Sequence, residues 1–89
     1  MRSEWDETKR AANIAKHGID FTVAYAFDWS CAEIAADTRL AYGETRWVAR
    51  GPIERRVHVL VFVLRGQSVR LISLRKANKK EMRDYGKGI

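Results

Sequence analysis

The residue best suited to proton transfer near neutral pH is His17, because an unperturbed imidazole titrates at about pH 6.5. It stands directly before Gly18, at the end of a segment with helical spacing. A histidine there can instead stabilise the helix end through the helix dipole and the last free carbonyls. His17 is therefore a candidate for catalysis, with a structural role left open. His58 lies inside an apolar segment and is expected to be a structural, hydrogen-bonded side chain.

Arg75 is the strongest candidate for binding an anion. It ends an apolar segment with strand-like spacing, at a point where the chain gives way to a basic stretch. A guanidinium stays charged at any working pH, and its planar fork matches the oxygens of a phosphate. The alternative is an ion pair with a nearby acid such as Glu81 or Asp84.

Other side chains could support anion or base binding. Arg46 begins a second strand-like segment, and Arg50 shares its face. Lys76 could contact phosphate, although solvation at the surface explains it as well. Tyr85 and Tyr42 could stack on nucleobases, since every base offers a π-face, or they could close the core.

The sequence has no pattern typical of a bound metal or cofactor. Its two histidines fall in unrelated segments and Cys31 is its only cysteine, so the ligand spacing of a metal site is missing. Ser73 has no accompanying Ser-His-Asp set and is expected to be a small strand residue. We expect any chemistry to depend on protein side chains alone.

The distribution of charge indicates an anionic partner. The formal net charge is +6, and residues 46–89 hold twelve Lys or Arg against three Asp or Glu. Such a segment attracts phosphate polymers, anionic lipids or an acidic protein. Scattered cations often serve only solubility, but crowding onto half of the chain favours nucleic acid.

The length of 89 residues suits one domain, expected to span residues 1–89. The longest apolar segment, Val57–Leu64, is too short to cross a bilayer. The N-terminal residues do not resemble a secretory signal. With a single cysteine, a reducing cytoplasm is the expected setting.

Two helices are expected before the strands. Asp6 is a good N-cap for the first, and Gly18 suits its left-handed end. A second short helix is expected from Asp20 through residue 27. It would point Phe21, Ala24, Tyr25 and Phe27 towards a core.

Alternating apolar residues then predict strands over residues 31–37, 45–51, 56–64 and 68–75. The segment 56–64 is apolar on both faces, so it should be central in its sheet. Short connections cannot make parallel crossovers, so an antiparallel meander is expected. A final helix should start at Asn78, with a capping box completed by Glu81.

The predicted fold is α+β, with the order α-α-β-β-β-β-α and a four-stranded antiparallel sheet. The N-terminal helices should cover one sheet face. The other face should be partly open and be lined by some of Arg46, Arg50, Ser73 and Arg75.

Three stretches of the sequence resemble the BrnT toxin family. "EWDETKRAANIAKHGIDF" is similar to its opening, a Trp-Asp and a helix followed by Asn-x-x-Lys-His-Gly and a Phe, here Asn13, Lys16, His17, Gly18 and Phe21. "YGETRWVARG" resembles its second strand. "LISLRKANKKEMRDY" resembles its Ile-Ser-x-Arg-x-Ala ending with a following Glu and Tyr. The likeness runs from about Glu4 to Tyr85, with Lys76 at a position expected to vary.

The resemblance implies a RelE-like fold and a toxin of a bacterial toxin–antitoxin pair that cleaves RNA without a metal and stops translation. It also implies a cognate, DNA-binding, BrnA-like antitoxin that neutralises the toxin in a hetero-oligomer, which represses its own operon.

Metal-free RNA cleavage needs a base for the ribose 2′-hydroxyl, an acid for the leaving 5′-oxygen and cations for the phosphate. The 2′-hydroxyl makes RNA, not DNA, the substrate. The resemblance thus assigns proton transfer to His17 and phosphate binding to Arg46 and Arg75. Further RNA contacts are expected from Arg50, Lys76 and Tyr85. A non-catalytic nucleic-acid-binding module and a protein-interaction subunit remain the alternatives.

Overall fold

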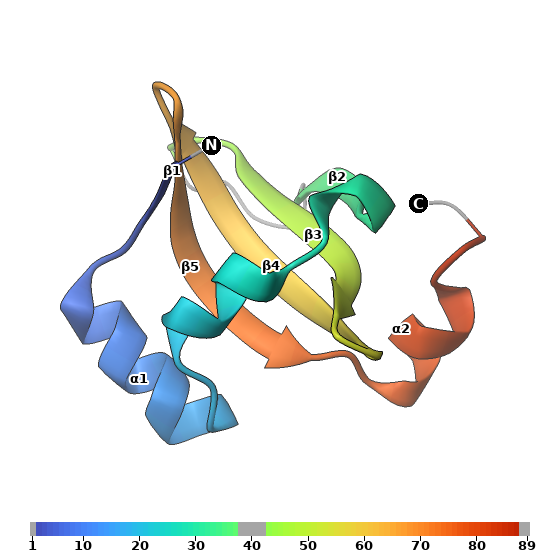
Figure 1. Ribbon diagram of the computed structural model, residues 1–89. Helices are drawn as coiled ribbons and strands as arrows, with labels where there is room; N and C mark the ends of the chain where they lie inside the picture. The colour runs from blue at the N-terminus through green and yellow to red at the C-terminus, as the bar shows by residue number, and fades with distance from the viewer. Residues whose placement is uncertain (1, 38–42, 88–89) are drawn as a thin grey trace.

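The sheet is the centre of this structure (Figure 1), a computed structural model that describes residues 2–37 and 43–87. Five strands lie in the order β1-β5-β4-β3-β2. Figure 1 shows α1 and α2 at opposite sides of the sheet, with η1 and η2 crossing its front. The elements along the chain are β1 (Arg2–Glu4), α1 (Glu7–His17), η1 (Phe21–Ala26), η2 (Trp29–Cys31), β2 (Glu33–Asp37), β3 (Arg46–Ile53), β4 (Arg56–Arg65), β5 (Ser68–Lys76) and α2 (Lys79–Asp84).

The sheet is mixed, so the expectation of four antiparallel strands is only partly right. Strands β2 to β5 form the predicted antiparallel meander, and β4 is central. The addition is β1, which pairs in parallel with β5, Arg2 opposite Ser68 and Glu4 opposite Arg70. Its three residues, Arg-Ser-Glu, are polar and show no apolar alternation, so no local pattern predicted a strand there. All of α1 lies between β1 and the meander, which makes the parallel pairing possible.

The predicted helix boundaries are confirmed where caps define them. The Asp6 carboxylate accepts a hydrogen bond from the Thr8 amide at 2.7 Å, and Gly18 ends α1 with φ of 71°. At α2, Asn78 and Glu81 form the predicted capping box. These caps satisfy amide groups that a helix end leaves without partners.

The predicted second helix has the expected position and cap but is a 3-10 helix, η1, with Asp20 as its N-cap. A further 3-10 turn, η2, follows it, and the Asp28 carboxylate starts that turn by accepting from the Ser30 amide. Residues three apart lie on one face of a 3-10 helix. Phe21, Ala24 and Phe27 are therefore buried, whereas Tyr25 is 70% exposed instead of facing the core as predicted.

The core lies between one face of the sheet, here the core face, and the two 3-10 turns. Ala49, Leu60 and Leu74 are aligned across β3, β4 and β5, and all are fully buried. Phe21 packs on this face from η1. The opposite, outer face carries two aligned rows, Arg50–Val59–Arg75 and Val48–Val61–Ser73. Strand alternation puts Arg46 on the outer face too, so the prediction that these cations share one face is confirmed.

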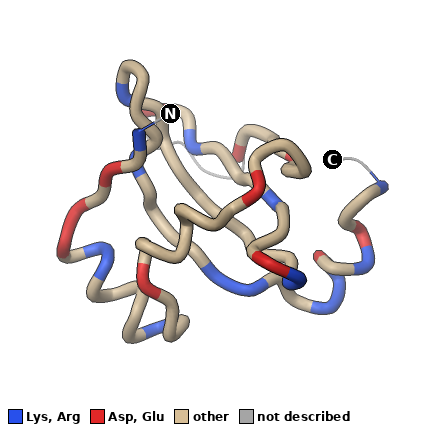
Figure 2. The backbone as a smooth tube through the Cα atoms, in the orientation of Figure 1, with Lys and Arg blue, Asp and Glu red and all other residues tan. Residues whose placement is uncertain are grey.

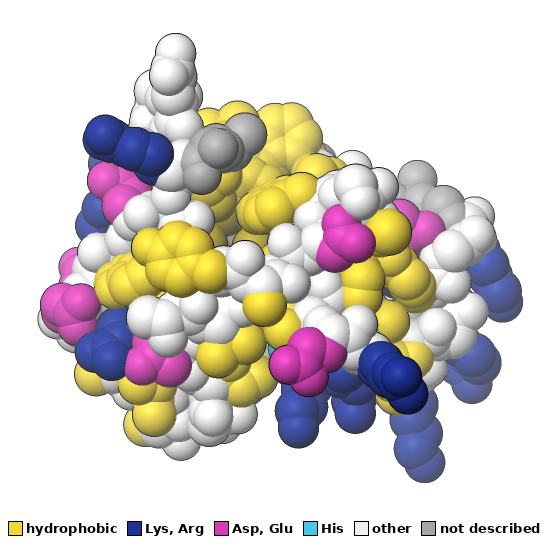
Figure 3. All heavy atoms as spheres, viewed as in Figure 1, with side chains coloured by type: hydrophobic (Ala, Val, Ile, Leu, Met, Phe, Trp, Pro, Cys, Tyr) yellow, Lys and Arg dark blue, Asp and Glu magenta, His cyan; other side chains and the backbone are white. Residues whose placement is uncertain are grey.

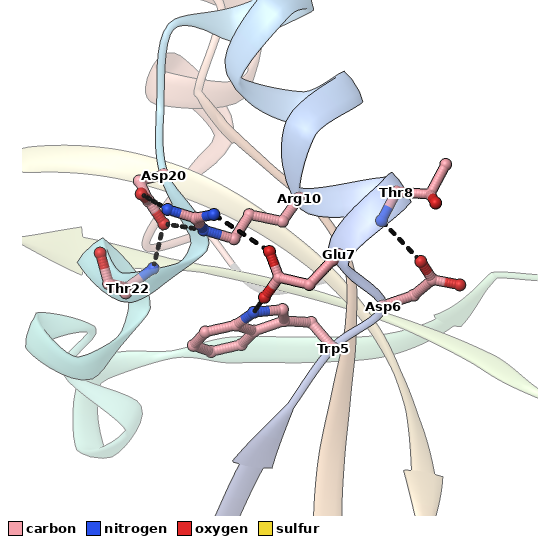
Figure 4. Close-up of polar contacts among 7 residues, drawn as sticks. All are labelled: Trp5, Asp6, Glu7, Thr8, Arg10, Asp20 and Thr22. Atoms are coloured by element: carbon pink, nitrogen blue, oxygen red, sulfur yellow. Dashed lines mark hydrogen bonds and ion pairs between the residues drawn. The ribbon is translucent and has the colours of Figure 1, made fainter.

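Ion pairs fix α1 to η1. Arg10 lies between Asp20 and Glu7 in Figure 4, and its Nη2 is 2.6 Å from Asp20 Oδ2. The hydrogen bond from Arg10 lowers the pKa of Asp20 to about 2. Trp5 donates to Glu7 at 3.1 Å in the same network. The result is a defined turn between His17 and Phe21, which fixes where α1 ends.

Asn13 attaches α1 to the edge of β5. Strand β1 covers β5 only as far as Arg70, so the backbone of Leu74 has no strand partner on that side. The Asn13 side chain supplies both bonds: it donates to the Leu74 carbonyl at 2.8 Å and accepts from the Leu74 amide at 3.0 Å. It also donates to the Ile19 carbonyl at 2.9 Å. A single buried amide thus replaces one step of a strand.

Replacing Asn13 with alanine should therefore reduce the free energy of unfolding by about 3 kcal/mol, because each buried polar group left unbonded costs about 1–3 kcal/mol. Urea denaturation followed by circular dichroism measures the change. Ile14→Ala is the matched control, since Ile14 is 38% exposed on the same helix and should lose much less. Equal losses for the two variants would show that the paired bonds to Leu74 contribute little.

Candidate active site

A cleft of about 470 Å³ separates α1 from the outer face of the sheet. Polar side chains line it on both sides, and the sheet side also includes the apolar side chains of Val61 and Ile72. The lining residues include Lys9, Lys16 and His17 of α1, with Val61, Ile72, Ser73 and Arg75 of the sheet.

The local fold explains why the cleft forms here. The pairing of β4 with β5 shifts register between Val61 and Phe62, so that Val61 lies opposite Ser73 and Phe62 opposite Leu71. Ile72 is the extra residue of this irregularity. Such bulges redirect side chains and are frequent beside functional sites. Asn13 holds α1 against the same part of β5, which sets the width of the cleft.

His17 borders the cleft as the last residue of α1 and is half-buried. Burial lowers its pKa below 6.5, and the charges of Lys16 and Arg75 lower it further. Each of these causes disfavours the imidazolium. At neutral pH the ring is therefore predominantly unprotonated and able to accept a proton.

Arg75 borders the same cleft from the end of β5 and is held by an acid. Its Nη1 and Nη2 lie 2.7 and 2.8 Å from the two carboxylate oxygens of Glu81. The bond from Arg75 lowers the pKa of Glu81, whose Oε1 also accepts from the Asn78 amide at 2.9 Å. The ion pair that the sequence left open is thus present. It joins α2 to the sheet and fixes the direction of the guanidinium.

Arg50 and Arg46 share the outer face with Arg75 but do not line the cleft. One strand separates Arg50 from Arg75, so their backbones are about 10 Å apart. Arg50 is bound to Glu33 at 3.3 Å. Arg46 lies four residues earlier, at the start of β3, opposite Asp37. The sheet therefore places three arginines on one surface and brings only Arg75 to His17.

Lys76 and Tyr85 also lie away from the cleft lining. Lys76 is exposed at the end of β5, opposite His58. The Tyr85 hydroxyl donates to the Cys31 carbonyl and links the end of α2 to η2. His58 is buried and its Nδ1 is 2.8 Å from the Arg56 carbonyl, as expected for a structural histidine. Tyr42 lies outside the described residues.

Lys9 and Lys16 line the cleft, but they were not identified from the sequence as site residues. Lys9, Asn13 and Lys16 are spaced i, i+4 and i+7, which places them on one side of a helix. This polar stripe is visible in the sequence and could have indicated the site. In the structure the most buried residue of α1 is Asn13 rather than one of its apolar residues. The helix turns a polar side, not an apolar one, towards β5.

Residues 2–37 and 43–87 contain no group of three His, Cys, Asp or Glu side chains arranged to hold a metal ion. Within the same ranges no helix has the length and hydropathy needed to cross a membrane.

Comparison with known proteins gives the class first and then the family. Residues 5–81 match the family described as "Ribonuclease toxin, BrnT, of type II toxin-antitoxin system". The protein is a ribonuclease toxin of a type II toxin–antitoxin system. The chain belongs to the BrnT family, as its opening and closing motifs indicated.

A solved structure supports the same assignment. The crystal structure of the Brucella abortus ribonuclease toxin BrnT, at 1.1 Å resolution, superposes with a TM-score of 0.68. The two sequences are 28% identical over 89% of this chain and 100% of the other. A search of curated proteins found no match.

Proposed function

We propose that this toxin cleaves RNA without a metal, by attack of a ribose 2′-hydroxyl on the adjacent phosphate in the cleft beside α1. The observation that carries the proposal is that His17 and Arg75 border one cleft. One group suits proton transfer at neutral pH, and the other suits binding of the phosphate.

The proposed reaction transfers two protons and exchanges one bond at phosphorus. His17 takes the proton of the 2′-hydroxyl, and O2′ attacks phosphorus. The bond from phosphorus to O5′ breaks as the charge on the phosphate oxygens is stabilised by Arg75. The leaving oxygen takes a proton from solvent or from the ammonium groups of the cleft. The products are a 2′,3′-cyclic phosphate and a 5′-hydroxyl.

The remaining predicted contacts are proposed as RNA-binding groups outside the cleft. We assign Arg46 and Arg50 to the RNA backbone on the outer face rather than to the bond that breaks. Lys76 would contact RNA at the end of β5. The role of Tyr85 in stacking on a base stays a prediction. Its hydroxyl is bound to the Cys31 carbonyl, and this bond does not involve the face of the ring.

Membership of a type II toxin family also supports a partner and a setting. We propose that a cognate, DNA-binding antitoxin neutralises this chain in a hetero-oligomer. The toxin would act in the cytoplasm, where cleavage of RNA inhibits translation.

The test is cleavage of a defined RNA by the protein alone in excess EDTA, and in a separate reaction with purified ribosomes in Mg²⁺ buffer. The expected products carry 2′,3′-cyclic phosphate ends, and a substrate with 2′-deoxyribose at the cut site should stay intact. Cleavage that disappears with EDTA, or that cuts the deoxy substrate equally, would contradict the mechanism. RNA that binds but stays whole with and without ribosomes would favour a non-catalytic binding module.

A further inference from the structure

A second cationic surface lies outside the cleft, and we call it the basic ridge. It is formed by exposed side chains from the β3–β4 turn, the end of β5 and α2. Its members are Arg55, Arg56, Lys76, Lys79, Lys80 and Arg83. In Figure 2 the basic segments of this turn and of α2 lie close together. Figure 3 shows dark blue side chains gathered along the lower margin of the molecule.

Backbone contacts hold the three segments together. Arg56 Nη2 donates to the Ala77 carbonyl at 2.9 Å, and the Ala77 amide donates to the Val57 carbonyl at 3.0 Å. The turn before β4 is thereby fixed against the start of α2. Cations distant in the sequence consequently share one surface whose shape is set by the fold.

The placement of these cations is unfavourable for α2 itself. Lys79 and Lys80 occupy its first turn, where the helix dipole disfavours positive charge. Lys79 and Arg83 are spaced i, i+4, and like charges at that spacing repel each other. Asp84 compensates Lys80 at 2.9 Å, whereas Glu81 is engaged with Arg75. Solubility requires charge but does not require cations crowded in this way. A bound polyanion would reduce the repulsion between them.

The ridge borders the cleft through α2. Arg75 is bound to Glu81 of α2 at 2.7 Å, so the cations of α2 lie near its guanidinium, and a strand whose scissile phosphate lies at Arg75 meets the ridge with its neighbouring nucleotides. Long exposed side chains such as those of Lys76, Lys79 and Arg83 suit a backbone of repeated phosphates and carry no base-specific geometry.

We propose that the basic ridge binds the phosphate backbone of single-stranded RNA next to the cleavage point, independently of base sequence. This inference rests on the proposed function, because the cleft is taken as the RNA site. It adds a binding surface that makes affinity depend on RNA length: an RNA confined to the cleft does not reach the ridge.

The test uses Lys79→Gln/Arg83→Gln against the control Arg2→Gln/Arg65→Gln, which removes two exposed cations from the other end of the molecule. Both variants are titrated with 2′-O-methyl oligouridine of roughly 20 and roughly 4 nucleotides, lengths on either side of a typical single-strand site. The ridge variant should bind the longer strand about tenfold more weakly, and the slope of log Kd against log salt should fall by about 1.4. The shorter strand and the control variant should bind as wild type does.

These RNAs lack a free 2′-hydroxyl, so the result does not depend on cleavage. If the EDTA experiment fails, RNA binding by the basic ridge is not contradicted. If this titration fails, cleavage in the cleft is not contradicted. Equal weakening of both strands, or by both double variants, would overturn the proposal. Unchanged RNA binding with weaker antitoxin binding would assign the ridge to the protein partner instead.

Discussion

Arg75→Ala is expected to lower the rate of RNA cleavage by about 10²–10³-fold, the usual loss when one group that stabilises transition-state charge is removed. In the cleft Arg75 is the cation beside His17 whose direction is fixed, by two bonds of 2.7 and 2.8 Å to Glu81. A fixed guanidinium need not reorganise as negative charge develops on the phosphate. Single-turnover cleavage with enzyme in excess measures this loss without the effect of product release.

The same ion pair supplies a rival explanation, because it also attaches α2 to the sheet. The Arg75 side chain is 34% exposed, so the pair should contribute only about 1 kcal/mol or less to stability. Glu81→Gln separates the two roles: it removes the charge from the pair but keeps Arg75 in place. Cleavage should fall much less in Glu81→Gln, which keeps one acceptor oxygen for Arg75, than in Arg75→Ala, with Arg75→Lys between them because a lysine retains charge without the fork. Equal loss in Glu81→Gln and Arg75→Ala would mean that Arg75 acts by positioning α2.

The fold could be predicted wherever one signal was strong and local. The two apolar faces of residues 56–64 indicated a central strand, and β4 is central. The caps at Asp6, Gly18 and Asn78 fixed the helix ends. Tyr25 was predicted wrongly because a short apolar segment fits an α-helical and a 3-10 period almost equally well. The two periods diverge only at the fourth residue.

Longer-range features had no comparable signal. Strand β1 depends on pairing with residues 68–70 at the far end of the chain, and three polar residues cannot indicate that. The site shows the same division. The chemistry of His17 and Arg75 was readable from their residue types. Their meeting in one cleft depends on Asn13 bonding to Leu74 across 61 residues of sequence, which no local pattern contains.

His17→Ala should reduce the rate of cleavage by about 10²–10⁴-fold, the usual contribution of a general acid or base. The direction of its pKa shift favours the role of a base. Burial and the charges of Lys16 and Arg75 lower its pKa, so the unprotonated ring persists below the pH at which a free histidine would be half protonated. A base in this state keeps kcat/KM level through neutral pH and loses activity only as the pH falls through the lowered pKa.

The pH profile therefore tests the role more sharply than the rate alone. Wild type should show an acidic limb below about pH 6.5, and His17→Ala should lose that limb. A rate that instead falls as the pH rises through this range would make His17 the acid that protonates O5′. A limb unchanged in His17→Ala would give it a structural role at the end of α1.

Lys16→Gln provides an independent check on the same group. Lys16 is a direct electrostatic cause of the lowered His17 pKa, so removing its charge should raise that pKa and move the acidic limb to higher pH. The His17 ring itself is unchanged, and the limb should persist. A purely structural lysine would alter the rate or stability without moving the limb. The shift of the limb therefore connects the electrostatics of the cleft to the proton that we propose His17 accepts.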